Sequence, residues 1–380
     1  DREALGQLQE EFGGKIAELQ QAIFDVTGET FNILSPKQLG AVLFEKLGLP
    51  AGRKTKSGYS TDAEVLEGLV HAHPVVPLVL QYRAFSKLKS TYVDGLLKLS
   101  DDEGIIHTTL NQTVTATGRI SSAEPNLQNI PVRTDLGRVM RKVFIPRAEG
   151  NVLVDADYSQ IELRVLAHMA GEQNMIDAFL RGEDIHARTA AEVYDVPLDQ
   201  VTPQMRSSAK AVNFGIVYGI SDFGLARNIG VTRKEAAAFI EKYFARYPRI
   251  KAYMDDCVRV GRQQGYVTTL LGRRRNLPEL ASTNYQTRSF GERAAMNTPI
   301  QGTAADIIKI AMVRTAEALK REGLRAQLIL QVHDELIVDA PREEAEQVGA
   351  LLKREMENAV HMQVPLTAEV KTGRSWYETK

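Results

Sequence analysis

The spacing of apolar residues along the chain indicates helices first and a mixture of strands and helices later. Leucine, isoleucine and phenylalanine recur near the helical spacing over residues 1–48, and Ser35-Pro36 predicts the start of a second helix within that stretch. Further helical patterns cover 62–72 and 77–99. The loop at 50–61 is basic and rich in hydroxyl groups, which fits either a phosphate contact or an ordinary solvated loop. We therefore expect a helical N-terminal region.

The pattern changes after residue 104. Thr, Ile and Val partly alternate over 104–120, which predicts strands. The later segments are a strand at 152–158 followed by a helix, a mostly helical stretch at 172–288, a helix at 291–321, a strand pair at 326–340, a helix at 342–360 and a last strand near 364–371. This order predicts an α+β core interrupted by a helical lobe.

Composition narrows the class of protein. The chain has 380 residues, of which 43% are hydrophobic, so it can form several packed cores in two to three domains. Its net charge of -1 does not indicate a nucleic-acid binder, so any phosphate-binding charge must be local. The single cysteine, Cys257, cannot form an intramolecular disulfide. No apolar run approaches 18 residues, so we expect no membrane span and a soluble, cytoplasmic protein.

Two groups of carboxylates stand at the ends of apolar strands. Asp155 and Asp157 are two residues apart, so both would project from one face of a strand. Apolar arms flank His333-Asp334-Glu335, which predicts a tight hairpin with acids at its tip. Adjacent acids between buried strands repel each other, and a magnesium ion would remove that cost. Alternatively, the turn contains Asp only because hairpin turns favour it.

A stripe of cations and aromatic rings is predicted on one helix. Thr202 and Pro203 mark its first turn, and Arg206, Lys210, Phe214 and Tyr218 follow at four-residue intervals. Each such step turns the side chain by only about 40°, so the four form one stripe. Cations followed by rings suit the phosphates, sugar and base of a nucleoside triphosphate. The alternative is an amphipathic helix with a polar edge.

Two further polar segments could read a DNA groove. The segment 118–131 is rich in amides and hydroxyls, and Arg, Asn and Gln can donate to minor-groove acceptors that nearly all base pairs present. Arg293, Asn297 and Gln301 recur every four residues on another helix. The arginines at 273–275 fit either a phosphate contact or a solvated turn, and His186 alone would more often be a satisfied surface histidine.

Three motifs in this order resemble family A DNA polymerases, the DNA polymerase I group. They are D-Y-S-Q-I-E-L-R at 157–164, R-x-x-x-K-x-x-x-F-G-x-x-Y-G at 206–219 and Q-V-H-D-E-L at 331–336, and T-G-R-I-S-S-A-E-P-N-L-Q-N-I-P also matches. The resemblance covers essentially the whole chain. It implies an α+β, right-hand fold with an antiparallel-sheet palm, helical fingers and a helical thumb. The implied bounds are thumb 1–95, palm 96–170 and 289–380, and fingers 171–288.

The resemblance also implies the roles of individual residues. The metal ligands would be Asp157 and Asp334, with Tyr158 contributing and Glu335 as a supporting acid. The nucleotide would be bound by Arg206, Lys210, Phe214, His186, Glu162, Gln160, Tyr158 and Tyr218, with Lys210 also catalytic and Glu162 excluding ribonucleotides. The DNA contacts would be Arg119, Asn126, Gln128, Arg293, Asn297, Gln301 and His333.

The implied reaction adds a nucleotide from a dNTP to a primer 3′-hydroxyl on primer–template DNA. Two Mg²⁺ ions, which Mn²⁺ could replace, would lower the pKa of the hydroxyl and bind the leaving pyrophosphate. Because the thumb would start at residue 1, we expect no 3′–5′ exonuclease domain and no proofreading. A monomer in a bacterial cytosol or nucleoid, active in DNA replication and repair, would fit this family.

Two other interpretations have different consequences. A single-subunit RNA polymerase would share the acids and the Arg/Lys pattern, but Glu162 in its S-Q-I-E-L-R context argues against it. A catalytically inactive DNA-binding module is disfavoured because every named acid and cation is present.

Overall fold

The computed structural model of the chain describes residues 1–51, 54–55, 58–131 and 135–380. The chain divides into two compact units. The first comprises Asp1–Thr109, Ser122–Ile145 and Ser375–Glu378, and the second comprises Leu110–Ser121, Pro146–Arg374 and Thr379–Lys380. Each unit is therefore built from chain segments that are far apart in the sequence.

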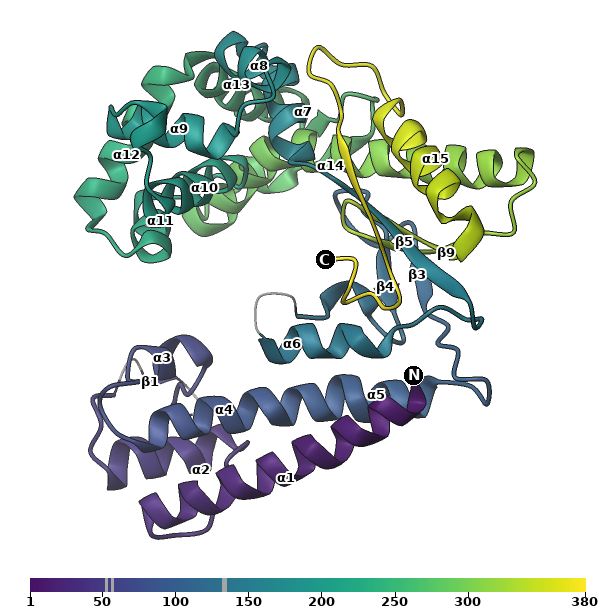
Figure 1. Cartoon of the computed structure of the whole chain (residues 1–380). Coiled ribbons are helices and arrows are strands. Elements are labelled where there is room, and N and C mark those ends of the chain that lie inside the picture. Colours follow the sequence, from purple (N-terminus) through teal and green to yellow (C-terminus); the bar gives the residue numbers. More distant parts are fainter. Residues whose placement is uncertain (52–53, 56–57, 132–134) are drawn as a thin grey trace. The chain divides into compact units, whose positions relative to one another are not determined.

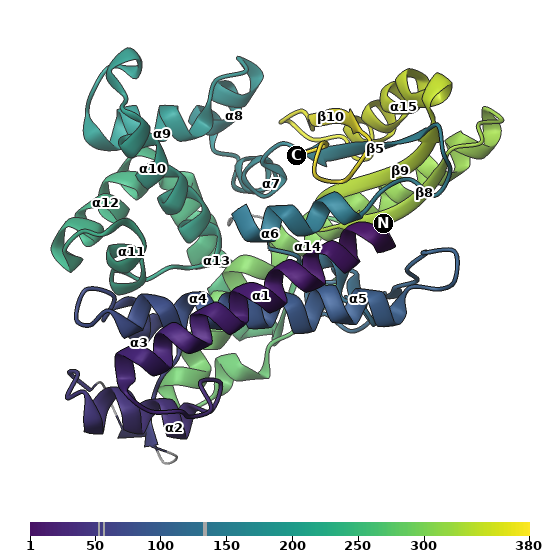
Figure 2. The same cartoon turned by 60° about the horizontal axis from the view of Figure 1, so that its bottom comes forward.

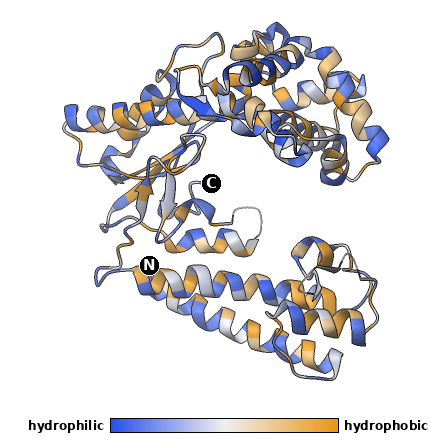
Figure 3. Ribbon diagram, turned by 180° about the vertical axis from the view of Figure 1, so that it is seen from behind, coloured by the Kyte–Doolittle hydropathy of each residue, from blue (hydrophilic) through white to orange (hydrophobic). Residues whose placement is uncertain are grey.

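The first unit is built on a pair of long helices. Helix α1 (Arg2–Thr27) begins where the Asp1 carboxylate accepts a hydrogen bond from the amide of Ala4, and ends at Gly28, whose φ of 69° favours glycine. Helix α1 lies along α4 (Val75–Lys87), as Figure 2 shows. Coloured by hydropathy, apolar and polar residues alternate along the helices of this unit, as expected of helices with one buried face (Figure 3).

The remaining elements of the N-terminal segments are short. As predicted, Ser35 caps α2 and Pro36 occupies its first turn. The elements are α2 (Pro36–Gly40), the π-helical η1 (Ala41–Lys46), β1 (Lys54–Thr55), β2 (Gly58–Tyr59), α3 (Ala63–Glu67), π-helical η2 (Leu88–Val93), α5 (Asp94–Leu99), β3 (Thr109–Asn111), β4 (Ser121–Ala123), 3₁₀-helical η3 (Leu127–Asn129), α6 (Asp135–Val139) and 3₁₀-helical η4 (Met140–Val143).

A four-stranded antiparallel sheet forms the centre of the second unit. Its strand order is β10-β5-β9-β8, made of β5 (Asn151–Tyr158), β8 (Gln327–Val332), β9 (Glu335–Pro341) and β10 (Ala368–Gly373). Because β5 and β9 are central, both of their faces are largely buried. Helix α15 (Ala345–Glu357) packs on β5 and β10, and 3₁₀ turn η7 (Arg342–Glu344) precedes it (Figure 1).

A helical lobe is inserted between β5 and β8. Its elements are α7 (Ile161–Ala170), α8 (Gln173–Leu180), α9 (Ile185–Tyr194), η5 (Leu198–Gln200), α10 (Pro203–Val217), α11 (Asp222–Ile229), α12 (Arg233–Arg246), α13 (Pro248–Gln264), β6 (Tyr266–Thr268), β7 (Arg274–Asn276), η6 (Pro278–Ala281) and α14 (Tyr285–Arg321). One continuous apolar core joins these helices to the sheet. The predicted α+β core with a helical insertion is therefore confirmed.

Two local predictions were wrong. Within 104–120 only β3 is a strand, because the Thr115 hydroxyl donates to the Arg119 carbonyl and Gly118 has a φ of 82°, which closes a turn instead. The hairpin of β6 and β7 interrupts the stretch predicted as helical. The basic loop at 50–61 lies partly outside the described residues. No described helix combines the length and apolar character that crossing a membrane requires.

Candidate active site

The end of β5 carries two acids with different surroundings. Asp155 and Asp157 lie on the same face of the strand, two residues apart. The Asp155 side chain is 2% exposed, whereas that of Asp157 is 51% exposed. Strand register brings Asp157 opposite Glu335, the first residue of β9. A carboxylate on one strand thus faces a carboxylate on the next.

The hairpin between β8 and β9 places a third acid beside this pair. As predicted, Val332 pairs with Glu335 and leaves a two-residue turn, His333-Asp334. His333 has a φ of 52°, which a turn of this length requires. The Tyr158 amide donates to the Asp334 carbonyl at 3.0 Å, so the turn is tied to the end of β5. Asp157 and Asp334, 177 residues apart in sequence, therefore come together.

Lys380 lies among the acids. Its Nζ is 2.5 Å from Glu335 Oε2, 3.2 Å from Asp155 Oδ2 and 3.8 Å from Asp157 Oδ2. The Thr379 hydroxyl donates to Asp155 Oδ2 at 3.0 Å. Burial alone would lower the pKa of Lys380, but the carboxylates of Glu335 and Asp155 outweigh burial and raise it. The ammonium is therefore charged and partly neutralises the cluster.

The acids are costly to ionise in this position. Burial, with Glu162 and Asp157 nearby, raises the pKa of Asp334 to about 7 despite the opposing charge of Arg119. Burial and Glu335 raise the pKa of Asp155 to about 7. Burial likewise raises the pKa of Asp157. No set of three metal-binding side chains is preassembled in the described part of the chain. A cation would lower the cost of ionising these acids.

A second charged group borders Asp334. Arg119 Nη2 is 2.8 Å from Glu162 Oε1 and 3.9 Å from Asp334 Oδ1. The Tyr218 hydroxyl lies 3.5 Å from the same Glu162 oxygen, and burial raises the pKa of Tyr218 to about 12. Glu162 is buried, at 5% exposed, although it lies in the first turn of α7. The loop before β4, the start of α7 and the end of α10 therefore meet beside the acids.

Helix α10 carries the predicted stripe on its accessible side. The Thr202 side chain caps the helix and Pro203 occupies its first turn, as the sequence predicts. Arg206, Lys210 and Tyr218 are exposed and Phe214 is half-buried. Ala209, Val212 and Ile216 face the core instead. The cations and rings are thus available to a ligand.

The helix preceding this stripe supplies its polar neighbours. Asp184 caps α9 by accepting from the amides of His186 and Ala187, and its other oxygen is 2.6 Å from Arg206 Nε. His186 is buried, contrary to its interpretation as a surface residue, and its Nδ1 is 3.0 Å from Asn213 Nδ2. Burial lowers the pKa of His186 to about 4, so the imidazole is neutral at pH 7. It can hydrogen-bond a phosphate but adds no charge.

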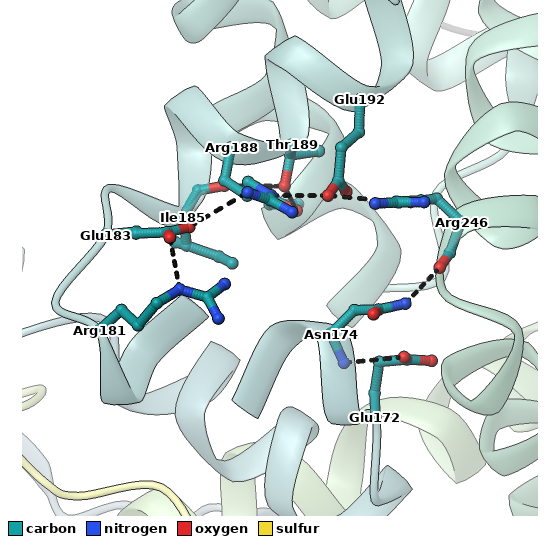
Figure 4. A network of polar contacts seen from close by, with 10 residues as sticks. Glu172, Asn174, Arg181, Glu183, Ile185, Arg188, Thr189, Glu192 and Arg246 are labelled. Atoms are coloured by element: carbon teal, nitrogen blue, oxygen red, sulfur yellow. Dashed lines mark hydrogen bonds and ion pairs between the residues drawn. The ribbon is translucent and has the colours of Figure 1, made fainter. Parts of the chain in front are cut away.

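An ion-pair network fixes the orientation of α9. Arg188 pairs with Glu183 and Glu192, at 3.5 and 2.7 Å, and Arg246 at the end of α12 pairs with the same Glu192 at 3.1 Å (Figure 4). The Glu192 side chain is 9% exposed. Asn174 of α8 donates to the Arg246 carbonyl (Figure 4). These contacts therefore tie together three helices of the lobe, α8, α9 and α12.

Helix α14 supports the other side of the site. The Asn297 amide donates to the Val217 carbonyl at 3.3 Å, and a Cβ at Gly219 (φ 65°) would come within 2.9 Å of Met296. The end of α10 is therefore packed tightly on α14. Arg293 is exposed and its Nη1 is 2.8 Å from the Ser289 hydroxyl, while Gln301 is half-buried two turns further along.

The arginines at 273–275 have structural partners. Arg273 Nη2 is 2.6 Å from Asp306 Oδ1, Arg274 lies over the ring of Tyr266, and Arg275 donates to the Thr298 hydroxyl. A Cβ at Gly118 would lie 2.7 Å from Arg273 Nε, so the residue before Arg119 is in close contact with this anchored arginine.

Three predicted residues have partners outside this group of side chains. Asn126 and Gln128 belong to the first unit, where Asn126 caps η3 and Gln128 accepts from the Ser122 amide. The Tyr158 hydroxyl donates to the Met356 carbonyl in the core, so only the main-chain carbonyl of Tyr158 could reach a metal. Gln160 adopts a φ of 55° at the start of α7.

Sequence reasoning missed the residues that contact the acids from outside the motifs. Lys380 and Thr379 are far in sequence from the acids that they contact. Only their side-chain types, a cation and a hydroxyl, could have indicated that they bind carboxylates. Asp184 could have been found, because Asp two residues before His186 fits a helix N-cap.

Comparison with known proteins defines the family of this fold and site. The profile of DNA polymerase family A matches residues 2–378, and the chain belongs to that family. "DNA polymerase I" of Caldicellulosiruptor bescii is 56% identical over the whole chain, and that of Bacillus subtilis (strain 168) is 54% identical. The chain spans 45% and 43% of their lengths, respectively, less than half of each relative.

A solved structure has the same fold. The POL domain of Pol1 from M. smegmatis, in complex with DNA primer-template and dNTP, matches with a TM-score of 0.95 at 46% identity. The match covers 100% of this chain and 67% of the other.

Proposed function

We propose that the chain is a DNA-templated DNA polymerase that adds a deoxynucleotide from a dNTP to a primer 3′-hydroxyl and releases pyrophosphate. One observation carries the proposal. Two accessible acids from distant motifs, Asp157 and Asp334, lie near each other at one end of the central strands of an antiparallel sheet and are costly to ionise without a cation. Membership of DNA polymerase family A and the primer-template and dNTP bound to the M. smegmatis relative support it.

The acids fit a pair of divalent ions. Carboxylate oxygens are the ligands that Mg²⁺ prefers, and Mn²⁺ accepts the same set. Burial is the main cause of the raised pKa values of Asp157 and Asp334, and a bound cation would favour the ionised form of both acids. When bound, two Mg²⁺ ions would activate the primer hydroxyl and stabilise the leaving pyrophosphate. The Tyr158 carbonyl would complete the ligands, with Glu335 as a supporting acid.

The residues of α10 would bind the nucleotide. Arg206 and Lys210 would neutralise the triphosphate, with Lys210 nearest the reacting phosphate, and phosphoryl transfer depends mainly on such positioning and charge. Neutral His186 would donate a hydrogen bond to the same phosphates. Phe214 would pack on the sugar and Tyr218 would lie beside the templating position. Tyr158 and Gln160 would complete the binding site.

Glu162 would exclude ribonucleotides. Its side chain is buried and held by Arg119 at 2.8 Å, so it cannot swing away to make room for a 2′-hydroxyl. A hydrogen-bonded, fixed side chain makes a better steric barrier than a mobile one.

The remaining polar residues would contact DNA. Arg119, Arg293, Asn297, Gln301 and His333 would follow the primer–template near its terminus, and Asn126 and Gln128 would also contact DNA. We assign the thumb to 1–95, the palm to 96–170 and 289–380, and the fingers to 171–288. The protein would act as a monomer in the bacterial cytosol or nucleoid, in DNA replication and repair.

Primer extension with Mg²⁺ and four dNTPs tests the proposal. The parent should extend the primer and Asp334→Asn should not. Glu369→Gln is a matched control. Glu369 is exposed on β10 opposite Asp157, and its substitution removes the same negative charge as Asp334→Asn. Equal extension by Asp334→Asn and the parent would show that the metal assignment is wrong. A mismatched primer terminus, run in parallel, tests whether the chain removes a mispaired nucleotide.

The same assay separates the other candidate activities. A preference for ribonucleotides would indicate an RNA polymerase. Tight primer–template binding without extension under any metal would indicate an inactive DNA-binding module.

A further inference from the structure

Four carboxylates lie close together on the central strands of the sheet and the turn between β8 and β9. The two proposed ions need only two of them as side-chain ligands. Asp155, Asp157, Asp334 and Glu335 come from β5 and the β8–β9 hairpin. Nothing in residue type distinguishes the four, since each carboxylate can bind Mg²⁺. The structure must therefore supply the distinction.

We propose that Lys380 is a positioning residue that holds Asp155 and Glu335 as a lysine-bound pair and so leaves Asp157 and Asp334 to the metals. The inference rests on the proposed function, because it explains which acids of that site bind metal. Lys380 would act through the carboxylates and would not touch the substrate.

The distances from the ammonium support this division. Nζ is within hydrogen-bonding distance of Glu335 Oε2, at 2.5 Å, and Asp155 Oδ2, at 3.2 Å. It is 3.8 Å from Asp157 Oδ2, beyond a hydrogen bond. Thr379 donates to the same Asp155 oxygen as the ammonium. Two neighbouring residues therefore hold Asp155, while Asp157 receives only the longer-range charge.

Burial divides the acids in the same way. The side chains of Asp155 and Glu335 are 2% and 7% exposed. Those of Asp157 and Asp334 are 51% and 25% exposed. A hydrated divalent ion can approach the second pair, and it would have to displace an ammonium to reach the first. An ammonium satisfies buried carboxylates with directional hydrogen bonds, and breaking such a contact leaves uncompensated buried charge.

Metal binding to the whole protein without DNA or dNTP tests the proposal directly. Mn²⁺ is titrated into metal-stripped protein, and unbound Mn²⁺ is measured by electron paramagnetic resonance. The key variant is Lys380→Met, which keeps the side-chain length and removes the charge. Lys371→Met is the matched control. Lys371 is exposed on β10 opposite Asp155, so its substitution removes the same charge from the neighbouring strand. Lys380→Arg should behave as the parent.

Lys380→Met should bind Mn²⁺ at least about tenfold more tightly than Lys371→Met, or bind an additional ion, because two carboxylates lose their ammonium. Adding Asp155→Asn to Lys380→Met should abolish that gain. In the absence of metal, the melting temperature of Lys380→Met should fall on the order of 5 °C below that of Lys371→Met.

A second measurement does not depend on how Lys380→Met folds. Asp155→Asn alone should leave Mn²⁺ binding within about twofold of the parent, because Asp155 is already held by Lys380 and Thr379. Loss of Mn²⁺ binding in Asp155→Asn would overturn the inference. Equal Mn²⁺ binding by Lys380→Met and Lys371→Met would also overturn it.

Failure of the proposed function would look different. Asp334→Asn should lose the Mn²⁺ binding of the parent. If Asp334→Asn still binds Mn²⁺ as the parent does, the assignment of the metal ligands is wrong. The tighter Mn²⁺ binding of Lys380→Met, and its loss when Asp155→Asn is added, would still test whether Lys380 holds the pair of Asp155 and Glu335.

Discussion

Asp157 and Glu335 face each other across β5 and β9 as the last residue pair of their antiparallel register. The two acids differ in their surroundings, since Asp157 is half exposed and Glu335 is buried against Lys380. Directly opposed like charges destabilise a sheet unless something compensates them. Placing these two acids opposite each other therefore lowers the stability of the folded protein at this position.

The first prediction ranks the two acids of the hairpin. Asp334→Asn should lower kcat by more than about 10³-fold, because it removes a proposed metal ligand. Glu335→Gln should lower kcat only about 10- to 100-fold, because an acid that supports the ligands is less costly to lose. Steady-state primer extension at saturating dNTP measures both. The reverse order would exchange the roles of the two acids.

The second prediction concerns stability against pH without metal. The folded pKa of Asp334 is about 7 and the unfolded value is about 3.9, so the native state keeps a proton that the unfolded chain has lost. Its contribution to the free energy of unfolding is therefore fully present below pH 4 and is lost as pH rises to 7, by at most about 1.4 kcal/mol per pH unit.

Thermal melts of the metal-stripped parent and of Asp334→Asn at pH 4, 5, 6 and 7 measure this effect. The variant should lose less stability over that range, and its advantage should be greatest near pH 7. Parallel curves for the two proteins would contradict the raised pKa. The comparison cancels the opposing effect of His186, whose lowered pKa is common to both proteins.

The third prediction concerns choice of sugar. Glu162→Ala should raise incorporation of ribonucleotides relative to deoxynucleotides by about 10²-fold or more, because the variant opens space beside the 2′ position. The ratio of kcat/KM for one NTP and its dNTP measures this change. Glu162→Gln keeps the side-chain size and should retain most of the discrimination. An unchanged ratio in Glu162→Ala would rule out the steric role.

The fourth prediction uses the ion pair between Asp184 and Arg206. A bound triphosphate would compete with Asp184 for Arg206, whose Nε lies 2.6 Å from Asp184 Oδ2. Because exposed pairs contribute about 0–1 kcal/mol, Asp184→Asn should lower the KM for dNTP by up to about fivefold. Asn still caps α9, so the helix should be preserved. Arg206→Ala should raise KM, and an unchanged KM in both variants would place Arg206 outside the nucleotide site.

The fifth prediction concerns the network behind the stripe. Glu192→Gln should lower the free energy of unfolding by about 1–2 kcal/mol, because Glu192 is nearly buried between Arg188 and Arg246. Arg181→Gln, at the exposed edge of the same network, should cost less than about 0.5 kcal/mol. Urea denaturation measures both. Equal costs would mean that burial of Glu192 adds nothing.

The sequence predicted those parts of the fold and site that local patterns determine. The four-residue spacing of Arg206 to Tyr218 and the cap at Thr202 needed only helix geometry, and the hairpin at His333-Asp334 needed only its flanking apolar arms. The strands expected at 104–120 failed because threonine serves turns as well as strands, and Gly118 with Thr115 selected a turn.

Tertiary contacts lay beyond prediction from sequence. The proximity of Lys380 to Asp155, or of Arg119 to Glu162, depends on how distant segments pack, and no local pattern contains that information. The burial of His186 was not predicted for the same reason, since it involves Asn213 and Phe214 on another helix.

The two-residue turn at His333-Asp334 also limits how this protein can be altered. Substitutions at the exposed His333 side chain leave the register of β9 intact, but an inserted residue that shifted this register by one would exchange the two faces of the strand, both of which are buried. Glu335 would then leave the face that it shares with Asp157. Natural variants and laboratory libraries of this hairpin should therefore contain substitutions but no insertions or deletions in the turn.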